Sequence, residues 1–150
     1  MRAITNIFLT DDDADDCLLF SEIIQEINPN EGTKLTISND GAALMKTLDE
    51  TVPPPPEVIF LDLNMPRKNG FEFLEEIRNT PKLMEIPVVI FSTSSSNDIV
   101  DRSYKFGANY YICKPQSYTL LKKTIAHVLS LGWEKLSGQP NRDDFVIKVA

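Results

Sequence analysis

The sequence predicts an α/β fold in which five parallel strands alternate with helices. Short apolar runs alternate five times with segments of helical periodicity along the chain. Parallel strands need long crossover connections, so the intervening helices are expected to cover both faces of one sheet. The chain has 150 residues, of which 42% are hydrophobic, and this suits a single domain with one sheet.

The first half of the chain supplies two complete strand–helix units. The first strand is followed by a helix whose apolar residues recur at nearly helical spacing and which ends at Pro29. Asp40 stands where a side chain can cap the second helix, and Ala42, Leu44, Met45 and Leu48 of that helix are expected to face the core. The expected elements are a strand over 4–10, a helix over 14–28, a strand over 34–38 and a helix over 41–50.

The second half begins after the tract Pro53 to Pro56, which favours a stiff, extended connector. The third strand, 57–62, is almost wholly apolar, so it is expected to be buried on both faces of the sheet. The remaining expected elements are a helix over 70–79, a strand over 87–92, a helix near 97–106, a strand over 109–113 and a helix over 117–131.

Right-handed crossovers make this sheet doubly wound, and the expected strand order is 2-1-3-4-5, the flavodoxin-like arrangement. We expect the domain to span residues 1–131. Residues 132–150 then form a short C-terminal extension. Most of it is expected to be loop, whereas FVIKV at 145–149 is a candidate extra strand.

Composition excludes several classes of function. The net charge of −7 argues against a nucleic-acid surface, which needs clustered Lys and Arg. The two cysteines, Cys17 and Cys113, have neither metal-site nor disulfide spacing; Cys113, in an apolar run, is expected to be buried. We find no signal peptide and no apolar run near the roughly 18 residues of a membrane helix. These features predict a cytoplasmic protein.

Polar residues follow four of the five strands, at the sheet edge where such folds bind ligands. Grouped carboxylates repel one another, and a hard dication such as Mg²⁺ resolves that repulsion. With Mg²⁺ and one lysine, three carboxylates reach near neutrality, as phosphoryl transfer requires. The residues at this edge are Asp11, Asp12 and Asp13 after the first strand, Asp62 after the third, Ser92 and Thr93 at the fourth, and Lys114 after the fifth.

Each of these residues also has an ordinary structural interpretation. Asp13 or Asp15 is expected to cap the first helix, Ser92 alone would be a turn residue, and Lys114 alone would be a surface lysine. The joint placement at four strand ends favours the functional interpretation. His127, the only histidine, has no candidate catalytic partner in the sequence.

Four motifs, IFLTDDDADD, VIFLDLNMPRKNG, PVVIFSTSSS and YICKP, resemble those of response-regulator receiver domains. The resemblance covers residues 4–131. DLNMPRKNG, GANYYICKP and the final Gly-Trp are similar to the single-domain subgroup of cyanobacterial phytochrome response regulators.

The resemblance implies a role for each matching position. Asp62 matches the phosphoacceptor, Lys114 the partner of the phosphoryl oxygens, Ser92 the switch hydroxyl and Tyr111 the switch aromatic. Serine replaces the commoner threonine at position 92, and Thr93 is bulkier than usual, which would restrict water and alter the lifetime of the phosphoryl group. The implied metal ligands are Asp11, Asp12, Asp62 and the backbone carbonyl of Asn64.

We therefore expect a phosphorylation-controlled switch rather than an ordinary enzyme. A sensor histidine kinase, of phytochrome-like type, is the expected donor, and a downstream protein is the expected target. Neither nucleic acid nor membrane is an expected partner. Two alternatives stay open: a small aspartate-based phosphatase, suggested by Asp11-x-Asp13, and a binding module that works without phosphorylation.

A homodimer is the expected assembly, because an apolar segment at the chain end could join the open edge of the fifth strand to a partner subunit. The alternative is that residues 137–150 form a frayed tail.

Overall fold

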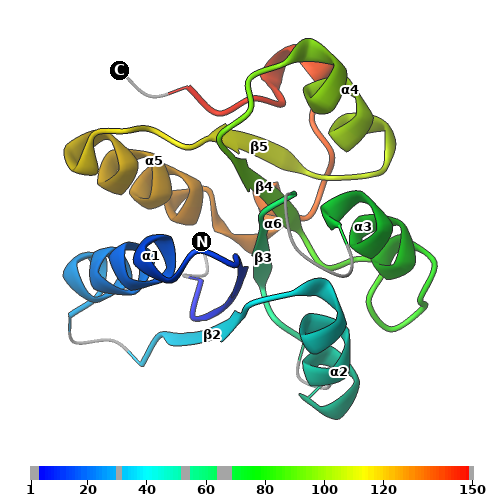
Figure 1. The fold of residues 1–150 in the computed structure, drawn as a ribbon, viewed down its shortest axis with the longest axis horizontal. Coiled ribbons are helices and arrows are strands. Elements are labelled where there is room, and N and C mark those ends of the chain that lie inside the picture. The colour runs from blue at the N-terminus through cyan, green and yellow to red at the C-terminus, as the bar shows by residue number, and fades with distance from the viewer. Residues whose placement is uncertain (1–3, 30–31, 52–54, 64–68, 149–150) are drawn as a thin grey trace.

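The computed structural model describes residues 4–29, 32–51, 55–63 and 69–148. They form one five-stranded parallel sheet in the order β2-β1-β3-β4-β5, as predicted (Figure 1). The strands are β1 (Asn6–Thr10), β2 (Lys34–Ser38), β3 (Val58–Leu61), β4 (Val88–Ser92) and β5 (Tyr110–Cys113). The helices are α1 (Ala14–Ile27), α2 (Gly41–Thr51), α3 (Gly70–Arg78), α4 (Asn97–Lys105), α5 (Tyr118–Ser130), α6 (Gly132–Leu136) and the 3-10 helix η1 (Arg142–Asp144).

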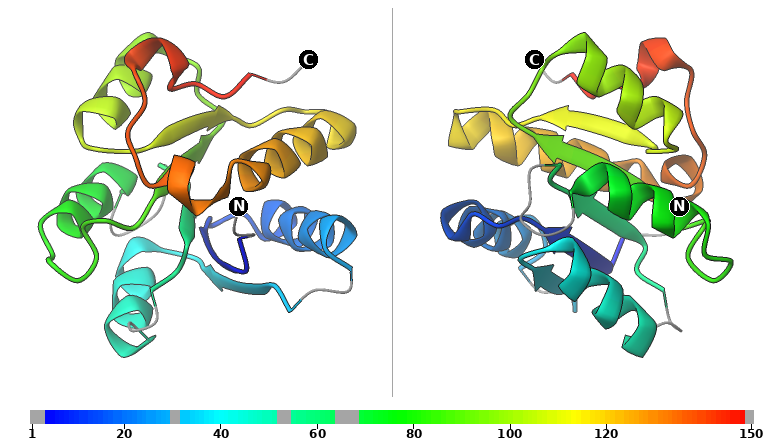
Figure 2. Two further views of the ribbon diagram at one scale, coloured as in Figure 1. Left: turned by 180° about the vertical axis from the view of Figure 1, so that it is seen from behind. Right: turned by 45° about the vertical axis from the view of Figure 1, so that its right-hand side comes forward.

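Helices cover both faces of the sheet. Helices α1 and α5 lie on one face and α2, α3 and α4 on the other (Figure 2). Alternate side chains of a strand point to opposite faces, so β3 sends Ile59 and Leu61 to one hydrophobic cluster and Val58 and Phe60 to the other. All four residues are buried, which confirms the prediction for this strand.

The helix starts nearest the strand ends are fixed by side-chain caps. The Asp13 carboxylate accepts hydrogen bonds from the backbone N–H groups of Asp15 and Asp16, and Asp40 Oδ1 accepts one from Ala43 N–H at 2.7 Å. Asp40 was predicted as a cap, and Asp13 was one of the two candidates, with Asp15, for the cap of the first helix. The sequence did not indicate the reciprocal pair between Asn69 and Glu72 that caps α3.

Helix α3 approaches the end of β3 closely because its first residue is a glycine. A Cβ at Gly70 would lie only 2.8 Å from Leu63 Cα, and the Gly70 N–H donates to Leu63 O at 3.1 Å. A side chain at position 70 would push the helix away from the segment that carries Asp62.

The C-terminal extension differs from the prediction. Residues after α5 form the short helix α6 rather than a loop, beginning at Gly132, whose φ of 78° favours glycine. The FVIKV segment forms no extra strand among its described residues: it makes one parallel bridge, Tyr111 with Val146. The 3-10 helix η1 ends at Asp144, and the side chain of the next residue, Phe145, is buried. Few residues of the tail are therefore left to run beside β5.

This extension closes part of the β5 edge within its own chain. The Tyr111 N–H donates to Phe145 O at 3.0 Å, and the Ile147 N–H donates to Tyr111 O at 2.9 Å. The expectation of an open edge on the fifth strand is therefore wrong at Tyr111, because the chain's own tail satisfies both backbone groups. The homodimer itself stays a prediction.

Two further side-chain positions differ from expectation. Cys113 is exposed rather than buried, because it is the last residue of an edge strand. Ala42 in α2, expected to face the core, is exposed too, and the helix packs through Leu44 and Leu48. Every helix in the described part of the chain is too short or too polar to span a lipid bilayer. Asn64, Pro53 and Pro54 lie outside the described residues.

Candidate phosphoacceptor site

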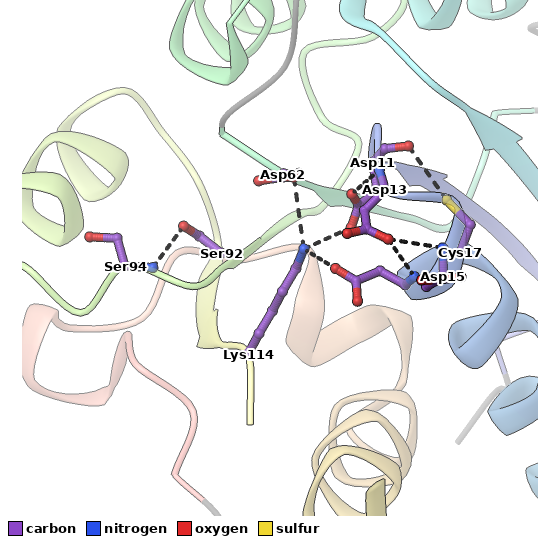
Figure 3. Close-up of polar contacts among 9 residues, drawn as sticks. Asp11, Asp13, Asp15, Cys17, Asp62, Ser92, Ser94 and Lys114 are labelled. Atoms are coloured by element: carbon purple, nitrogen blue, oxygen red, sulfur yellow. Dashed lines mark hydrogen bonds and ion pairs between the residues drawn. The ribbon is translucent and has the colours of Figure 1, made fainter. Parts of the chain in front are cut away.

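The candidate site lies at the edge of the sheet where the strands have their carboxyl ends. Asp11 directly follows β1, Asp62 follows β3, and Lys114 follows β5. Backbone hydrogen bonds hold these positions: the Asp62 N–H donates to Thr10 O at 2.9 Å, and the Lys114 N–H donates to Ser92 O at 2.7 Å. The parallel register thus brings together residues that are distant in the sequence (Figure 3).

Three carboxylates form the acidic part of the site. Asp11, Asp12 and Asp62 each offer a carboxylate oxygen, and these atoms all lie within 4.8 Å of one another. Asp11 and Asp62 are buried, whereas Asp12 is exposed and leaves the cluster open to water. An all-oxygen set with solvent access fits a hard divalent cation that keeps some of its waters. The structure therefore brings together the three side chains predicted as metal ligands.

The Lys114 ammonium reaches into this acidic cluster. Its Nζ lies 2.8 Å from Asp11 Oδ2, 2.9 Å from Asp16 Oδ2 and 3.8 Å from Asp62 Oδ2. It also lies 4.9 Å from the centre of the Phe91 ring. The lysine side chain is 10% exposed, so these contacts operate with little competition from water.

Electrostatics keep this lysine protonated. Burial alone lowers the pKa of Lys114, but hydrogen bonds from its ammonium to Asp11 and Asp16, with the nearby charge of Asp62, outweigh burial. The net result is a pKa raised above the ordinary value for lysine. Lys114 is thus a fixed cation beside the candidate acceptor.

Asp16 is a site residue that the sequence analysis missed. It belongs to the DDDADD run, but the direction of its side chain depends on the residue at which α1 begins. The Asp13 cap begins the helix at Ala14, and Asp16 then lies in the first turn, just before the buried Cys17. The phosphatase alternative would use Asp13 as the second carboxylate of Asp11-x-Asp13. In this structure the Asp13 carboxylate is instead engaged in capping α1.

Ser92 and Tyr111 meet at the loop after β4. Both side chains are fully buried. The Ser92 Oγ accepts a hydrogen bond from Ser94 N–H at 3.1 Å, and the Tyr111 hydroxyl donates to Ser94 O at 2.7 Å. Burial raises the pKa of Tyr111. Ser94 thus links the two predicted switch residues, while Thr93 is exposed.

Most of the chain is similar, in sequence and in structure, to known proteins of one family. The response regulator receiver domain family matches residues 7–126. Response regulator Rcp1 of Synechocystis sp. is 34% identical over 135 residues, which cover 87% of this chain and 90% of Rcp1. The structure of the phosphorylated cyanobacterial phytochrome response regulator RcpA superposes with a TM-score of 0.78 at 31% identity, covering 93% of this chain and 100% of RcpA.

The Mn²⁺-bound form of Rcp1 superposes with a TM-score of 0.69 at 32% identity, covering 90% of this chain and 99% of Rcp1. The resemblance to the phytochrome response regulators is therefore shared by sequence and structure. With its flavodoxin-like sheet and the family match over residues 7–126, this chain belongs to the response regulator receiver domain family of two-component signalling.

Proposed function

We propose that this protein is a signalling switch that accepts a phosphoryl group on Asp62 in a Mg²⁺-dependent reaction. The observation that carries the proposal is the meeting of three carboxylates with one ammonium after the carboxyl ends of β1, β3 and β5. The carboxylate oxygens of Asp11, Asp12 and Asp62 lie within 4.8 Å of one another, and Lys114 Nζ lies 3.8 Å from Asp62 Oδ2. Such a site neutralises the charge of an incoming phosphoryl group.

Asp11, Asp12 and Asp62 would hold the metal ion, together with the backbone carbonyl of Asn64, which lies outside the described residues. Bound Mg²⁺ supplies positive charge where the transferring oxygens gather. The exposure of Asp12 suits a cation that exchanges its waters. The Mn²⁺-bound form of Rcp1 supports a divalent cation in a relative of this chain.

In the proposed reaction a carboxylate oxygen of Asp62 forms a bond to phosphorus. The bond from phosphorus to the donor's histidine nitrogen breaks, and that nitrogen keeps the electron pair. Lys114 balances the charge on the phosphoryl oxygens, and the Ser92 hydroxyl donates a hydrogen bond to one of them. Slow hydrolysis, in which water attacks phosphorus and Asp62 leaves as a carboxylate, resets the switch without making the protein a general phosphatase.

A sensor histidine kinase is the proposed donor, and its phytochrome-like character rests on the similarity to Rcp1 and RcpA. The proposed output is protein–protein contact in the cytoplasm. Ser92 and Tyr111 would report the phosphorylated state to the α4–β5 side of the molecule, because both bond to Ser94 in the loop that leads into α4.

Phosphorylation by a small donor tests the function without a kinase. Intact-mass measurement after incubation with acetyl phosphate and Mg²⁺ should show one added phosphoryl group, which Asp62→Asn and chelation of the metal should each abolish. The matched control is Asp49→Asn, since Asp49 is exposed on α2 and forms an ion pair with Lys82 at 3.5 Å. Equal labelling of wild type and Asp62→Asn would refute the proposal.

A further inference from the structure

The Lys114 ammonium lies closer to Asp16 than to the candidate phosphoacceptor. Its Nζ is 2.9 Å from Asp16 Oδ2 but 3.8 Å from Asp62 Oδ2, and the longer distance exceeds a hydrogen bond. The Asp13 cap fixes the first turn of α1, because the Asp16 N–H donates to Asp13 Oδ1 at 3.1 Å. Asp16 is therefore held beside the lysine by its own helix start.

We propose that Asp16 is a positioning residue that holds the Lys114 ammonium on the α1 side of the site and competes with the phosphoryl group for it. The inference rests on the proposed function, because it concerns how readily the lysine engages a phosphoryl group on Asp62.

The competition follows from the donors of one ammonium group. Lysine has three N–H donors, and Asp11 and Asp16 each occupy one. Phosphorylation of Asp62 would add strong acceptor oxygens that draw the ammonium towards Asp62. Asp11 is buried beside Asp62 and can keep its bond, whereas the Asp16 pair has to lengthen or break as the ammonium moves.

The surroundings of Asp16 allow this exchange. Its side chain is 35% exposed, so water can take over its hydrogen bond when the lysine leaves. A cavity of about 300 Å³ opens beside the pair, and Asp16, Lys114 and Tyr118 are among its lining residues. Partial exposure also limits the strength of the pair, which sets the size of the expected effect.

The test compares two neutralising substitutions on the same helical turn. Asp16→Asn removes the carboxylate that contacts Lys114. Asp15→Asn is the matched control, because Asp15 is exposed, stands next in the sequence and also donates its N–H to Asp13. Both changes remove one charge from the start of α1, so any loss of favourable charge at the helix N-terminus is common to the two variants.

The probe is beryllofluoride, which mimics the phosphoryl group without a transfer step, titrated at fixed Mg²⁺ and followed by ¹⁹F resonance and calorimetry. We expect Asp16→Asn to bind it about two- to fivefold more tightly than Asp15→Asn does. Asp16→Glu, which keeps a carboxylate within reach, should restore the wild-type affinity. In the free protein, the ¹⁵N resonance of Lys114 Nζ should shift in Asp16→Asn and stay in place in Asp15→Asn.

Equal affinities for Asp16→Asn and Asp15→Asn would overturn the inference, since the effect would then be one of overall charge. Weaker binding by Asp16→Asn would also overturn it, because Asp16 would then assist the lysine. Failure of the proposed function is distinguishable: wild type would bind no beryllofluoride, or Asp62→Asn would bind it as tightly as wild type. That result would remove the basis of the inference too.

Discussion

The ring of Phe145 in the C-terminal tail packs against the ring of Tyr111 in β5, with their centroids 6.1 Å apart. The backbones of the same two residues share a hydrogen bond of 3.0 Å. Phe145 also meets Tyr104 of α4 at 5.1 Å, and the Tyr104 hydroxyl donates to Pro140 O at 2.7 Å. The tail is thus joined both to β5, which carries the predicted switch tyrosine, and to α4.

Replacing Phe145 should destabilise the whole domain, although it stands close to the end of the chain. Its side chain is fully buried in the cluster that contains Tyr111. Phe145→Ala should lower the free energy of unfolding by about 3 kcal/mol, measured by urea denaturation. Ile147→Ala, at a half-buried position of the same tail, is the control and should cost distinctly less. A loss no larger than that of the control would show that the tail is not part of the core.

The predicted homodimer is tested by removing the tail. We expect sedimentation to show a dimer for the full chain and a weaker dimer for a protein ending at Ser137, with a phosphoryl mimic shifting both equilibria. Because the tail already closes the β5 edge at Tyr111, such a dimer would have to use the outer surface of the tail or exchange tails between subunits. Monomers of both proteins at the same concentration, with and without the mimic, would contradict the prediction.

The two cysteines should differ strongly in reactivity. Burial and the nearby charge of Asp11 raise the pKa of Cys17 from 9.0 to about 11, whereas Cys113 is exposed. Iodoacetamide at pH 8 should therefore modify Cys113 and spare Cys17, as read by peptide mass. The raised pKa has a consequence for stability: the contribution of the neutral Cys17 thiol is complete below pH 9 and is lost as pH rises towards 11. Equal labelling of both thiols in the folded protein would contradict this assignment.

Asp12→Ala should abolish phosphorylation by a small donor. Asp12 is the exposed member of the carboxylate trio, so its loss removes one candidate metal ligand and leaves the two buried carboxylates in place. Asp15→Ala removes an exposed charge from the same acidic run and serves as the control. Labelling of Asp12→Ala at the wild-type rate would count against the proposed metal site, and a calorimetric Mg²⁺ titration would show independently whether the ion still binds.

Lys114→Ala should separate phosphorylation from its transmission. The variant keeps Asp62 and the acidic trio, so we expect it to accept a phosphoryl group slowly, but without the cation that draws the β5 end towards that group. Amide exchange at Tyr111 and in the tail should then change on phosphorylation in wild type and stay unchanged in the variant. An equal response in both proteins would mean that the signal leaves by another route.

The sequence was most informative where a general rule relates the order of the elements to their positions in the fold. Parallel strands deliver their carboxyl ends to one edge, so the order of the strands is enough to place Asp11, Asp62 and Lys114 together. Asp16 escaped because its direction depends on the residue at which α1 starts, and a shift of one residue rotates a side chain by about 100°. The packing of Phe145 on Tyr111 escaped because no local pattern encodes which surface a terminal segment will meet.

The contacts of Tyr111 form a continuous chain across the molecule. Phe145 packs on its ring, its hydroxyl donates to Ser94 O, and the Ser94 N–H donates to Ser92 beside the acidic site. If this series of contacts has two alternative arrangements, the binding of a partner protein to the tail and the phosphorylation of Asp62 are linked equilibria. A protein that drew the tail away from β5 and a phosphoryl group on Asp62 would then alter each other's free energy of binding by the same amount. The target protein that receives the signal would in that case also influence how much phosphorylated protein accumulates.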